Sequence, residues 1–276
     1  MTEAVLTLAQ AIARATALGV QRLDAQLLLL HALGRHQHER AWLLAHDQDP
    51  LPKDAARTFE VGYTRRLRGE PLAYLVGEKE FFGLMLAVDA RVLVPRPDTE
   101  TLVEWALTLI ANRTSPRVAD LGTGSGAIAL AIKSQRPDAQ VLGVDRSEAA
   151  LAVARANGQA LGLQVDWRAG DWLQGLDTGL DLVVSNPPYI RADDPHLAAL
   201  AHEPLSALAA GDDGLQDLRT IVAACPLHLA PQGWLLLEHG WDQADRVRAL
   251  LDTAGFVQVT SRRDLAGIER CSGGCR

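Results

Sequence analysis

Apolar positions recur every three to four residues through the first part of the chain, which is the spacing of a helix with one buried face. Four stretches show this pattern, at Leu6–Leu18, Asp24–Leu33, His38–Ala45 and Asp54–Leu67. Gly69 follows the last of them, as is typical of the end of a helix. Residues 1–75 are therefore predicted to form a small helical bundle domain.

The pattern changes after this first part. The apolar run from Glu80 to Leu86, followed by Val88 and Val92–Val94, predicts short strands and a hairpin-like linker over residues 76–95. Farther along, strand-like runs at Val118–Leu121, Val141–Val144, Leu180–Val184 and Trp234–Leu237 alternate with helical stretches at Ala127–Gln135, Glu148–Leu161, Leu215–Ala224 and Gln243–Ala254. This alternation predicts an α/β domain over residues 96–276, with a parallel sheet covered by helices on both faces.

Length and composition agree with two folded domains. The 276 residues are 48% hydrophobic and 22% charged, which supplies enough apolar material for a core and excludes disorder as the main state. The longest uncharged stretch, Thr220–Leu237, is broken by Pro226, Pro231 and Gly233, so it is not a membrane-spanning helix. Met1–Ala4 lacks the basic and apolar blocks of a secretory signal, and a cytoplasmic location is predicted.

Charge and cysteine content narrow the function classes. The net charge of −7 divides into +1 for residues 1–75 and −8 for the rest, which disfavours a protein that relies on attraction to nucleic acid phosphates. Cys225, Cys271 and Cys275 form no CxxC pair and are predicted to be free thiols. The four histidines between residues 31 and 46 lack a metal-binding spacing, so no metal site is predicted.

A glycine-rich loop follows the strand that ends at Asp120 and Leu121. It consists of Gly122, Thr123, Gly124, Ser125 and Gly126, and the next helix begins directly after it. Glycines at alternate positions let the backbone turn sharply and approach a ligand at a helix N-terminus. Asp145 ends the next strand, 19 residues after Gly126, close to the spacing at which a carboxylate meets ribose hydroxyls. GxGxG lacks one residue of the dinucleotide fingerprint and favours a cofactor without a pyrophosphate, such as S-adenosylmethionine.

Two residues near this loop leave two interpretations open. Asp120 either approaches the amino acid moiety of the cofactor or caps the glycine turn. Trp172 follows the short strand-like run Val165–Ala169, and its ring either lies beside the adenine or belongs to the core. Trp167 is predicted to be structural.

The strongest single signal is the tetrapeptide Asn186-Pro187-Pro188-Tyr189, which directly follows an apolar strand. The prolines stiffen the loop and donate no backbone hydrogen bonds. The Asn186 side-chain oxygen and the Pro187 carbonyl suit the two hydrogens of a planar NH2 group, and Tyr189 supplies a flat apolar wall. An amide nitrogen is a poor nucleophile, so orienting it toward an electrophilic methyl group is the help it most needs. The alternative is a proline-stiffened turn after a core strand.

These residues resemble class I S-adenosylmethionine-dependent methyltransferases that act on planar NH2 groups. Five segments narrow the resemblance to the family of peptide chain release factor glutamine methyltransferases, known as HemK/PrmC. They are Val94–Glu100, Asp120–Gly126, Val184–Ile190, Glu203–Leu205 and Leu237–Gly240. The likeness extends over nearly the whole chain and implies a Rossmann-like methyltransferase sheet with an N-terminal helical domain.

The resemblance implies methylation of the side-chain amide nitrogen of the glutamine in the Gly-Gly-Gln motif of bacterial release factors. It implies that the helical domain helps to grip this protein substrate. Hydropathy and charge predict no membrane partner and no stable nucleic acid binding, and a monomer is expected. The implied cofactor contacts are Gly122, Thr123, Gly124, Ser125, Gly126, Asp145, Trp172 and Asn186. The implied substrate contacts are Asn186, Pro187, Pro188 and Tyr189, with Asn186, Pro187 and Tyr189 as the catalytic residues.

Two segments outside these loops carry further expectations. Asp98 or Thr99 is predicted to cap a helix that runs to Ala111, and by resemblance Arg96 supports the adjoining cleft. His239, in the segment Leu237–Gly240, is expected to be structural.

The C-terminus departs from the family, which usually closes with an Asn-Glu-Arg-type strand. Ile268 stands in the place of that asparagine. The last five residues are rich in glycine, and we expect them not to form an edge strand.

Two rival functions remain at this stage. An amino methyltransferase acting on adenine or guanine in DNA or ribosomal RNA presents the same NH2 geometry, but it usually carries a basic recognition surface. A cofactor-binding protein without turnover is the second rival, and the intact Asn186–Tyr189 loop disfavours it.

Overall fold

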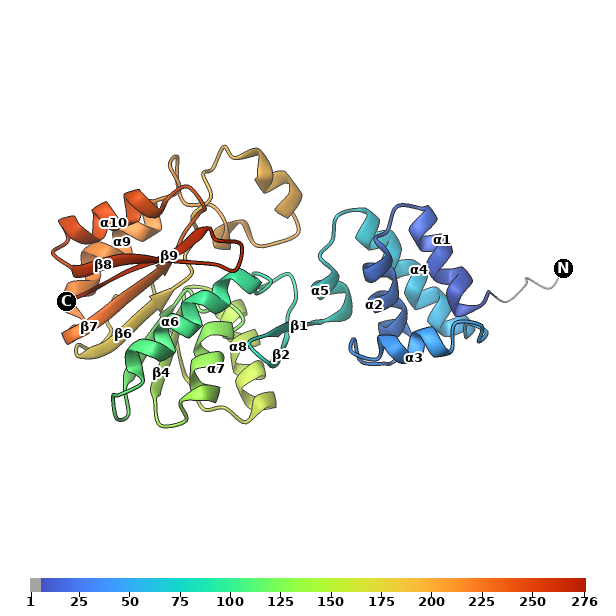
Figure 1. Cartoon of the computed structure of the whole chain (residues 1–276), viewed down its shortest axis with the longest axis horizontal. Helices are drawn as coiled ribbons and strands as arrows, with labels where there is room; N and C mark the ends of the chain where they lie inside the picture. Colours follow the sequence, from blue (N-terminus) through green and yellow to red (C-terminus); the bar gives the residue numbers. More distant parts are fainter. Residues whose placement is uncertain (1–5) are drawn as a thin grey trace. The chain divides into compact units, whose positions relative to one another are not determined.

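The computed structural model describes residues 6–276, so the absence of a secretory signal inferred from Met1–Ala4 concerns residues outside the described part. The chain divides into two compact units, one ending at Glu78 and the other beginning at Lys79 (Figure 1). Between residues 6 and 276, no helix has the length and apolar character needed to cross a membrane.

The N-terminal unit is helical, as predicted. Its helices are α1 (Leu8–Ala17), α2 (Arg22–Ala32), α3 (Arg40–Ala45), α4 (Lys53–Leu67) and α5 (Leu72–Val76). Thr7 and Gln10 form a capping box that begins α1, and an ion pair of 2.7 Å joins Arg66 of α4 to Asp24 of α2. Leucine side chains dominate the core, with Leu8, Leu29, Leu30 and Leu43 buried. The sequence pattern missed α5 because five residues are too few to show a helical period.

A hairpin of β1 (Glu78–Phe81) and β2 (Leu84–Ala87) follows the helices, and all of it except Glu78 belongs to the second unit. The strand expected at Val92–Val94 does not form, and this expectation is wrong. The Val92 amide donates to the Asp89 carbonyl in a turn, and the Val94 amide donates to the Glu203 carboxylate. Both apolar side chains are buried although their backbone is irregular, which accounts for the strand-like pattern.

A seven-stranded sheet forms the centre of this unit, in the order β5-β4-β3-β6-β7-β9-β8 (Figure 1). The strands are β3 (Arg117–Leu121), β4 (Gln140–Asp145), β5 (Asp166–Ala169), β6 (Leu180–Ser185), β7 (Leu229–Glu238), β8 (Val257–Arg263) and β9 (Glu269–Cys275). β3 to β7 pair in parallel, whereas β9 is antiparallel to both β7 and β8. The carboxyl ends of the parallel strands therefore meet at one edge.

Helices cover both faces of the sheet, as predicted. They are α6 (Glu100–Ile110), α7 (Ala127–Gln135), α8 (Glu148–Leu161), α9 (Gln216–Ala224) and α10 (Ala244–Thr253). On β6, Leu182 and Val184 pack into the core with α6 and α7, while Val183 packs into the opposite core with α9 and α10. This alternation along one strand shows that β6 is buried on both faces.

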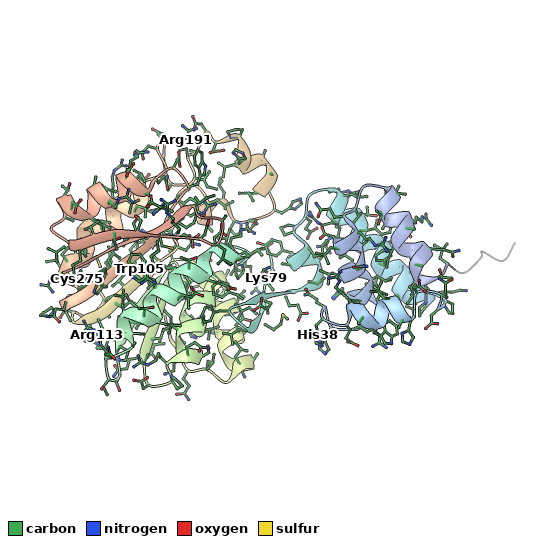
Figure 2. All side chains as sticks on the ribbon, in the orientation of Figure 1. His38, Lys79, Trp105, Arg113, Arg191 and Cys275 are labelled. Atoms are coloured by element: carbon green, nitrogen blue, oxygen red, sulfur yellow. The ribbon has the colours of Figure 1, made fainter. Side chains whose placement is uncertain are left out.

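The expectation that the last five residues do not form a strand is wrong. Residues 272–275 belong to β9, which lies inside the sheet between β7 and β8, and Arg276 follows it. A Cβ atom on Gly273 would lie 2.6 Å from the Leu235 carbonyl oxygen and 3.1 Å from the Trp105 ring (Trp105 and Cys275 are labelled in Figure 2). Glycine fits because Trp105 approaches the strand closely, and pairing on both sides outweighs its weak strand preference.

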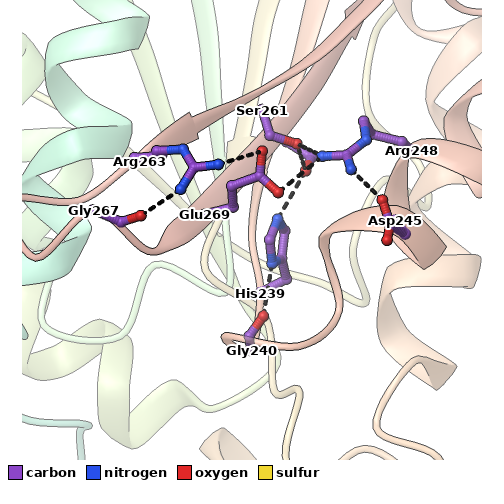
Figure 3. Close-up of polar contacts among 9 residues, drawn as sticks. His239, Gly240, Asp245, Arg248, Ser261, Arg263, Gly267 and Glu269 are labelled. Atoms are coloured by element: carbon purple, nitrogen blue, oxygen red, sulfur yellow. Dashed lines mark hydrogen bonds and ion pairs between the residues drawn. The ribbon is translucent and has the colours of Figure 1, made fainter.

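A buried polar network fixes β9 to the end of β7 (Figure 3). His239 Nδ1 lies 2.9 Å from the Gly240 carbonyl oxygen, and His239 Nε2 lies 2.8 Å from Ser272 Oγ. Ser272 Oγ is in turn 2.7 Å from Ser261 Oγ on β8. His239 is therefore structural, as expected. The three cysteines are free thiols, as predicted, and the structure shows that all three are buried.

Candidate active site

A cavity opens at the carboxyl edge of the sheet, where β3, β4 and β6 end. Its empty volume, including the part open to solvent, is about 790 Å³, within the range of small-molecule sites. Six predicted site residues line it, namely Gly122, Gly124, Asp145, Trp172, Asn186 and Pro188. The fold thus brings together residues from separate loops that the sequence singled out one by one.

The glycine loop is tied to the end of β4. The Gly122 amide donates to the Val144 carbonyl at 2.8 Å, and the Gly124 amide donates to Asp145 Oδ2 at 2.9 Å. Asp145 Oδ1 accepts from the Ser147 amide at 2.9 Å, at the start of α8. Each carboxylate oxygen has a further lone pair, so Asp145 retains the capacity to accept hydrogen bonds from a ligand.

Two glycines of the loop lie where an added side chain would crowd a tryptophan ring. Gly122 has a φ of +71°, and a Cβ atom there would lie 3.3 Å from the Trp172 ring. Gly126 has a φ of +84°, and a Cβ atom there would lie 2.8 Å from the Trp167 ring. Of the loop residues, Gly122 and Gly124 line the cavity, and they present no side chain to it, which fits a closely bound cofactor.

The remaining loop residues do not line the cavity. Thr123, Ser125 and Gly126 form the turn into α7, and the Thr123 hydroxyl donates to Asp120 Oδ2 at 2.6 Å. The same oxygen accepts from the Ala129 amide at 3.2 Å, so Asp120 caps the turn. Its Oδ1 is buried without a partner among residues 6–276, and burial raises the pKa of Asp120 to about 7.

Trp172 lies between the cavity and a hydrophobic core. Its ring lines the cavity beside Gly122 and also packs against the core that contains α9 and α10. Its φ of +51° is a left-handed conformation that is uncommon outside glycine. Trp167 instead fills the space beside Gly126 and Gly143, as a structural residue.

The Asn186–Tyr189 loop leaves β6 at the cavity, which Asn186 and Pro188 line and Pro187 and Tyr189 do not. Pro187 and Pro188 are buried, and Asn186 is half-buried with its Nδ2 3.2 Å from Thr99 Oγ1. Tyr189 is anchored at both ends, because its carbonyl accepts from Gln243 at 3.0 Å and its hydroxyl lies 3.5 Å from Glu238 Oε1. Burial, and then the Glu238 charge, raise the pKa of Tyr189, so its hydroxyl stays protonated.

The capping role predicted for Asp98 or Thr99 is wrong. A 3₁₀-helix at Pro97–Thr99 leads into α6, and neither helix has a side-chain cap. The Thr99 hydroxyl accepts a hydrogen bond from Asn186 Nδ2 instead. Asp98 Oδ2 lies 3.5 Å from Arg270 Nε. The polar side chains of this segment therefore contact Asn186 after β6 and Arg270 on β9 instead of capping the helix.

Glu238 and Glu203 are buried carboxylates at this edge that the sequence did not assign to the site. Glu238 Oε2 has no partner within the described residues, and burial raises the pKa of this carboxyl to about 7. Glu203 accepts from the Val94 amide at 3.0 Å and forms an ion pair with Arg96. Arg96 thus supports the cleft wall, because Pro204, next to Glu203, lines the cavity.

Other lining residues carried weak sequence signals. They are Arg91, Val92, Leu93, Val144, Arg146, Ser147, Ala150, Gly170, Asp171, Pro204, Ser206 and Ala207. Ser147 caps α8 by accepting from the Ala150 amide, and a serine directly before a helical run after Asp145 is a signal that could have found it. The segment 204–207 lies in a long irregular region, so only the fold brings it to the cavity.

Two family models match the chain. The PrmC N-terminal domain matches residues 4–77, and the methyltransferase small domain matches residues 99–209. A protein of Bordetella pertussis strain Tohama I, named release factor glutamine methyltransferase, is 52% identical over 260 residues, which cover 93% of this chain and 95% of that protein. A protein of the same name from Pseudomonas aeruginosa is 48% identical over 253 residues, 90% of each chain.

Solved structures share the fold. A methyltransferase from Pyrococcus furiosus has a TM-score of 0.55 and 18% identity, with 77% of this chain and 95% of that chain covered. A 16S rRNA N2 G1207 methyltransferase from T. thermophilus, solved with AdoMet and guanosine, has a TM-score of 0.55 and 18% identity, with 72% and 49% covered. At such identities the likeness concerns the fold alone.

Proposed function

Because the chain belongs to the release factor glutamine methyltransferase family, which uses S-adenosylmethionine, we propose that it methylates the glutamine of the Gly-Gly-Gln motif in bacterial peptide chain release factors. One observation carries this proposal. Asn186 lines the same cavity as Gly122, Gly124 and Asp145. Its side-chain NH2 group donates to Thr99, so its side-chain oxygen is available to a substrate NH2 group.

The cofactor half of the site uses the glycine loop and the carboxylate beside it. Gly122 and Gly124 allow close approach of the cofactor, and the Asp145 carboxylate accepts hydrogen bonds from its ribose hydroxyls. Trp172 forms the wall beside the adenine, while Thr123, Ser125 and Gly126 shape the loop. The bound cofactor supplies an electrophilic methyl group on a sulfonium.

The substrate half orients the acceptor nitrogen. Asn186 Oδ1 and the Pro187 carbonyl accept the two hydrogens of the glutamine amide, and Pro188 and Tyr189 form walls around its side chain. Catalysis is orientation of a weak nucleophile, because the amide lone pair is delocalised. When the nitrogen gains the methyl group it becomes acidic, and its proton leaves to solvent without a strong base.

The N-terminal unit grips the protein substrate in this proposal. A shallow groove between α2 and α4 combines apolar and basic side chains, which suits a protein partner. Its lining residues include Leu28, His31, Arg57, Val61, Arg65 and Leu75.

A methyl-transfer assay tests the function. Cofactor with a labelled methyl group is incubated with a purified release factor, with the same factor carrying alanine in place of the Gly-Gly-Gln glutamine, with duplex DNA and with ribosomal RNA. Mass mapping then locates the label. We expect label on that glutamine alone.

Enzyme variants tie the activity to the loop. Asn186→Ala should lower kcat by about 100-fold or more while the cofactor Kd changes little, because it removes an orienting acceptor. Asn112→Ala, at an exposed loop residue, is the matched control. Label on nucleic acid, or unchanged turnover in Asn186→Ala, would overturn the assignment.

A further inference from the structure

Gln243 lies at the carboxyl edge of the sheet, between the end of β7 and the start of α10. It directly precedes that helix, yet its side chain makes no capping hydrogen bond to it. Only 5% of its surface is exposed. A buried side-chain amide needs hydrogen-bond partners, so the partners of Gln243 are found outside α10.

The side chain of Gln243 joins three loops through their backbone groups. The Gly240 amide, after β7, donates to Gln243 Oε1 at 2.8 Å. Gln243 Nε2 donates to the Tyr189 carbonyl, after β6, at 3.0 Å. The same nitrogen lies 3.4 Å from the carbonyl oxygen of Gly214, before α9. One side-chain amide therefore connects the segments that follow β6 and β7 with the segment that precedes α9.

The backbone partners fix the orientation of this amide. A backbone N–H group only donates and a backbone carbonyl only accepts, so the Gln243 oxygen faces Gly240 and its NH2 group faces Tyr189. This conclusion is independent of how the oxygen and nitrogen are assigned. The Tyr189 carbonyl therefore receives its hydrogen bond from a donor that only the correct side chain at position 243 supplies.

The contact between Gln243 and the Asn186–Tyr189 loop is closely packed. Gly214 has a φ of +71°, and a Cβ atom there would clash with the Tyr189 carbonyl oxygen. The same Cβ atom would lie 2.9 Å from Gln243 Nε2. The hydrogen bond thus forms in a place that stays open because residue 214 has no side chain.

The Asn186–Tyr189 loop is held at both of its ends. Asn186 Nδ2 donates to Thr99 Oγ1 at 3.2 Å, and the Tyr189 carbonyl accepts from Gln243. Pro187 and Pro188 limit the backbone between these two anchors. A shift of Tyr189 is therefore passed on to Asn186 and Pro188, which line the cavity.

We propose that Gln243 is a positioning residue for methyl transfer, because its amide fixes the Tyr189 carbonyl and with it the orientation of the Asn186–Tyr189 loop. This inference rests on the proposed function, since it specifies how the loop that orients the acceptor nitrogen is itself held. Gln243 does not line the cavity and acts through Tyr189. Separate hydrogen bonds hold Asp145 and the glycine loop, so turnover depends on Gln243 more than cofactor affinity does.

Kinetics of a neutral variant test the proposal. Gln243→Met keeps the length of the side chain but leaves the backbone groups of Tyr189 and Gly240 without this partner. We expect kcat to fall about tenfold or more, while the cofactor Kd stays within about threefold. Gln159→Met, at an exposed glutamine of α8, is the matched control and should change neither value.

Two results with Gln243→Met would overturn the proposal. The first is a kcat within about threefold of that of the unmodified enzyme, since one buried hydrogen bond is worth more than that. The second is a cofactor Kd that rises as much as kcat falls, because the variant would then have damaged the whole site and not the orientation of one loop.

Gln243→Glu adds a test by pH, because it replaces the donor with a group that titrates. An ionised carboxylate only accepts and would face the Tyr189 and Gly214 carbonyl oxygens, whereas a protonated one donates to Tyr189 and accepts from Gly240. We expect the ratio of variant to unmodified kcat to rise about fivefold or more between about pH 8.5 and 6, since burial favours the protonated form. The ratio for Gln243→Met should stay constant. A ratio for Gln243→Glu that is low at both pH values would overturn the proposal.

The neighbouring charged and titratable groups are present in both proteins, so the ratio of the two kcat values cancels their contribution. They are His239, Asp242 and Asp245 near position 243, Glu238 on β7, Tyr189 in the loop, Asp98 with Arg270, and Asp213 with Arg219 and Arg246.

A spectroscopic measurement separates this inference from the proposed function. Tyr189–Ile190 is the only Tyr-Ile pair in the sequence, so ¹³C-carbonyl tyrosine and ¹⁵N-isoleucine together label a single peptide group. Its carbonyl carbon should move upfield in Gln243→Met, because the hydrogen bond to that oxygen is lost, and should not move in Gln159→Met. This readout needs no acceptor, so it stands even if no release factor is methylated. An unmoved carbonyl signal in Gln243→Met would overturn the positioning role.

Discussion

The amide of Gly124 donates a 2.9 Å hydrogen bond to Oδ2 of Asp145, which joins the glycine loop to the end of the neighbouring strand. The contact lets one carboxylate hold the loop and face the cavity at the same time. Because Asp145 Oδ1 also accepts from the Ser147 amide, the carboxylate cannot turn freely. Its orientation is therefore set before any ligand binds.

Asp145→Ala should raise the Kd for S-adenosylmethionine by about 10- to 100-fold, because charge-assisted hydrogen bonds to the ligand and to the loop are lost together. Isothermal titration calorimetry measures the Kd directly. Asp166→Ala, at an exposed carboxylate on the adjacent strand β5, is the control and should bind normally. A Kd for Asp145→Ala close to that of the control would exclude Asp145 from the cofactor site.

Gly126→Ala should lower the free energy of unfolding by roughly 2–4 kcal/mol, since it adds a left-handed backbone penalty to a steric clash. Its Cβ would lie 2.8 Å from the Trp167 ring. Gly162→Ala is a matched control, because its φ is +67° but no atom lies within 4 Å of the added Cβ. Urea unfolding followed by tryptophan fluorescence reports mainly on the second unit, which holds five of the six tryptophans. Equal losses in both variants would contradict the packing argument.

His239 should make stability fall in mild acid. Burial is the main cause that lowers the pKa of its imidazole in the folded chain, and the charges of Arg248 and Arg270 lower it further. The hydrogen bond with Gly240 and the charge of Glu269 oppose this shift without cancelling it. Below about pH 6.5 the unfolded state therefore binds more protons than the folded state, and the free energy of unfolding decreases as the pH falls. It is unaffected by this group at higher pH.

Urea titrations between about pH 7.5 and 5 compare this effect with His239→Gln, which does not titrate. The variant is expected to lose less stability than the unmodified protein over that interval. His38→Gln, at an exposed histidine, should follow the unmodified protein. Parallel pH profiles for the unmodified protein and His239→Gln would rule out the linkage.

Val61→Glu should raise the KM for a whole release factor by about tenfold, because a charge would enter a contact between protein surfaces. Val61 is 52% exposed on α4 and lines the groove of the N-terminal unit. The cofactor Kd should not change. Leu44→Glu, at an exposed leucine of α3 outside that groove, is the control. Steady-state kinetics with an unaltered KM in Val61→Glu would move the docking surface elsewhere.

The sequence alone determined the helical first part, the alternating second part and the loops at the cavity. Each signal is local, because glycines, prolines and strand ends constrain the backbone next to them in the chain. Gly122, Asp145 and Asn186 each follow a predicted parallel strand, and parallel strands end at one edge of a sheet. Their meeting in one cavity therefore required no long-range information beyond the fold class.

Only the tertiary structure decided which partners the polar side chains take. The local sequence predicts that Thr99 caps a helix, yet its hydroxyl accepts a hydrogen bond from Asn186, 87 residues away. The local sequence predicts that the glycines near the C-terminus form strands poorly. They nevertheless belong to the inner strand β9, because β7 and β8 pair with it and Trp105 packs against Gly273. In both cases contacts between elements far apart in sequence outweigh local preference, and the order of strands in the sheet sets those contacts.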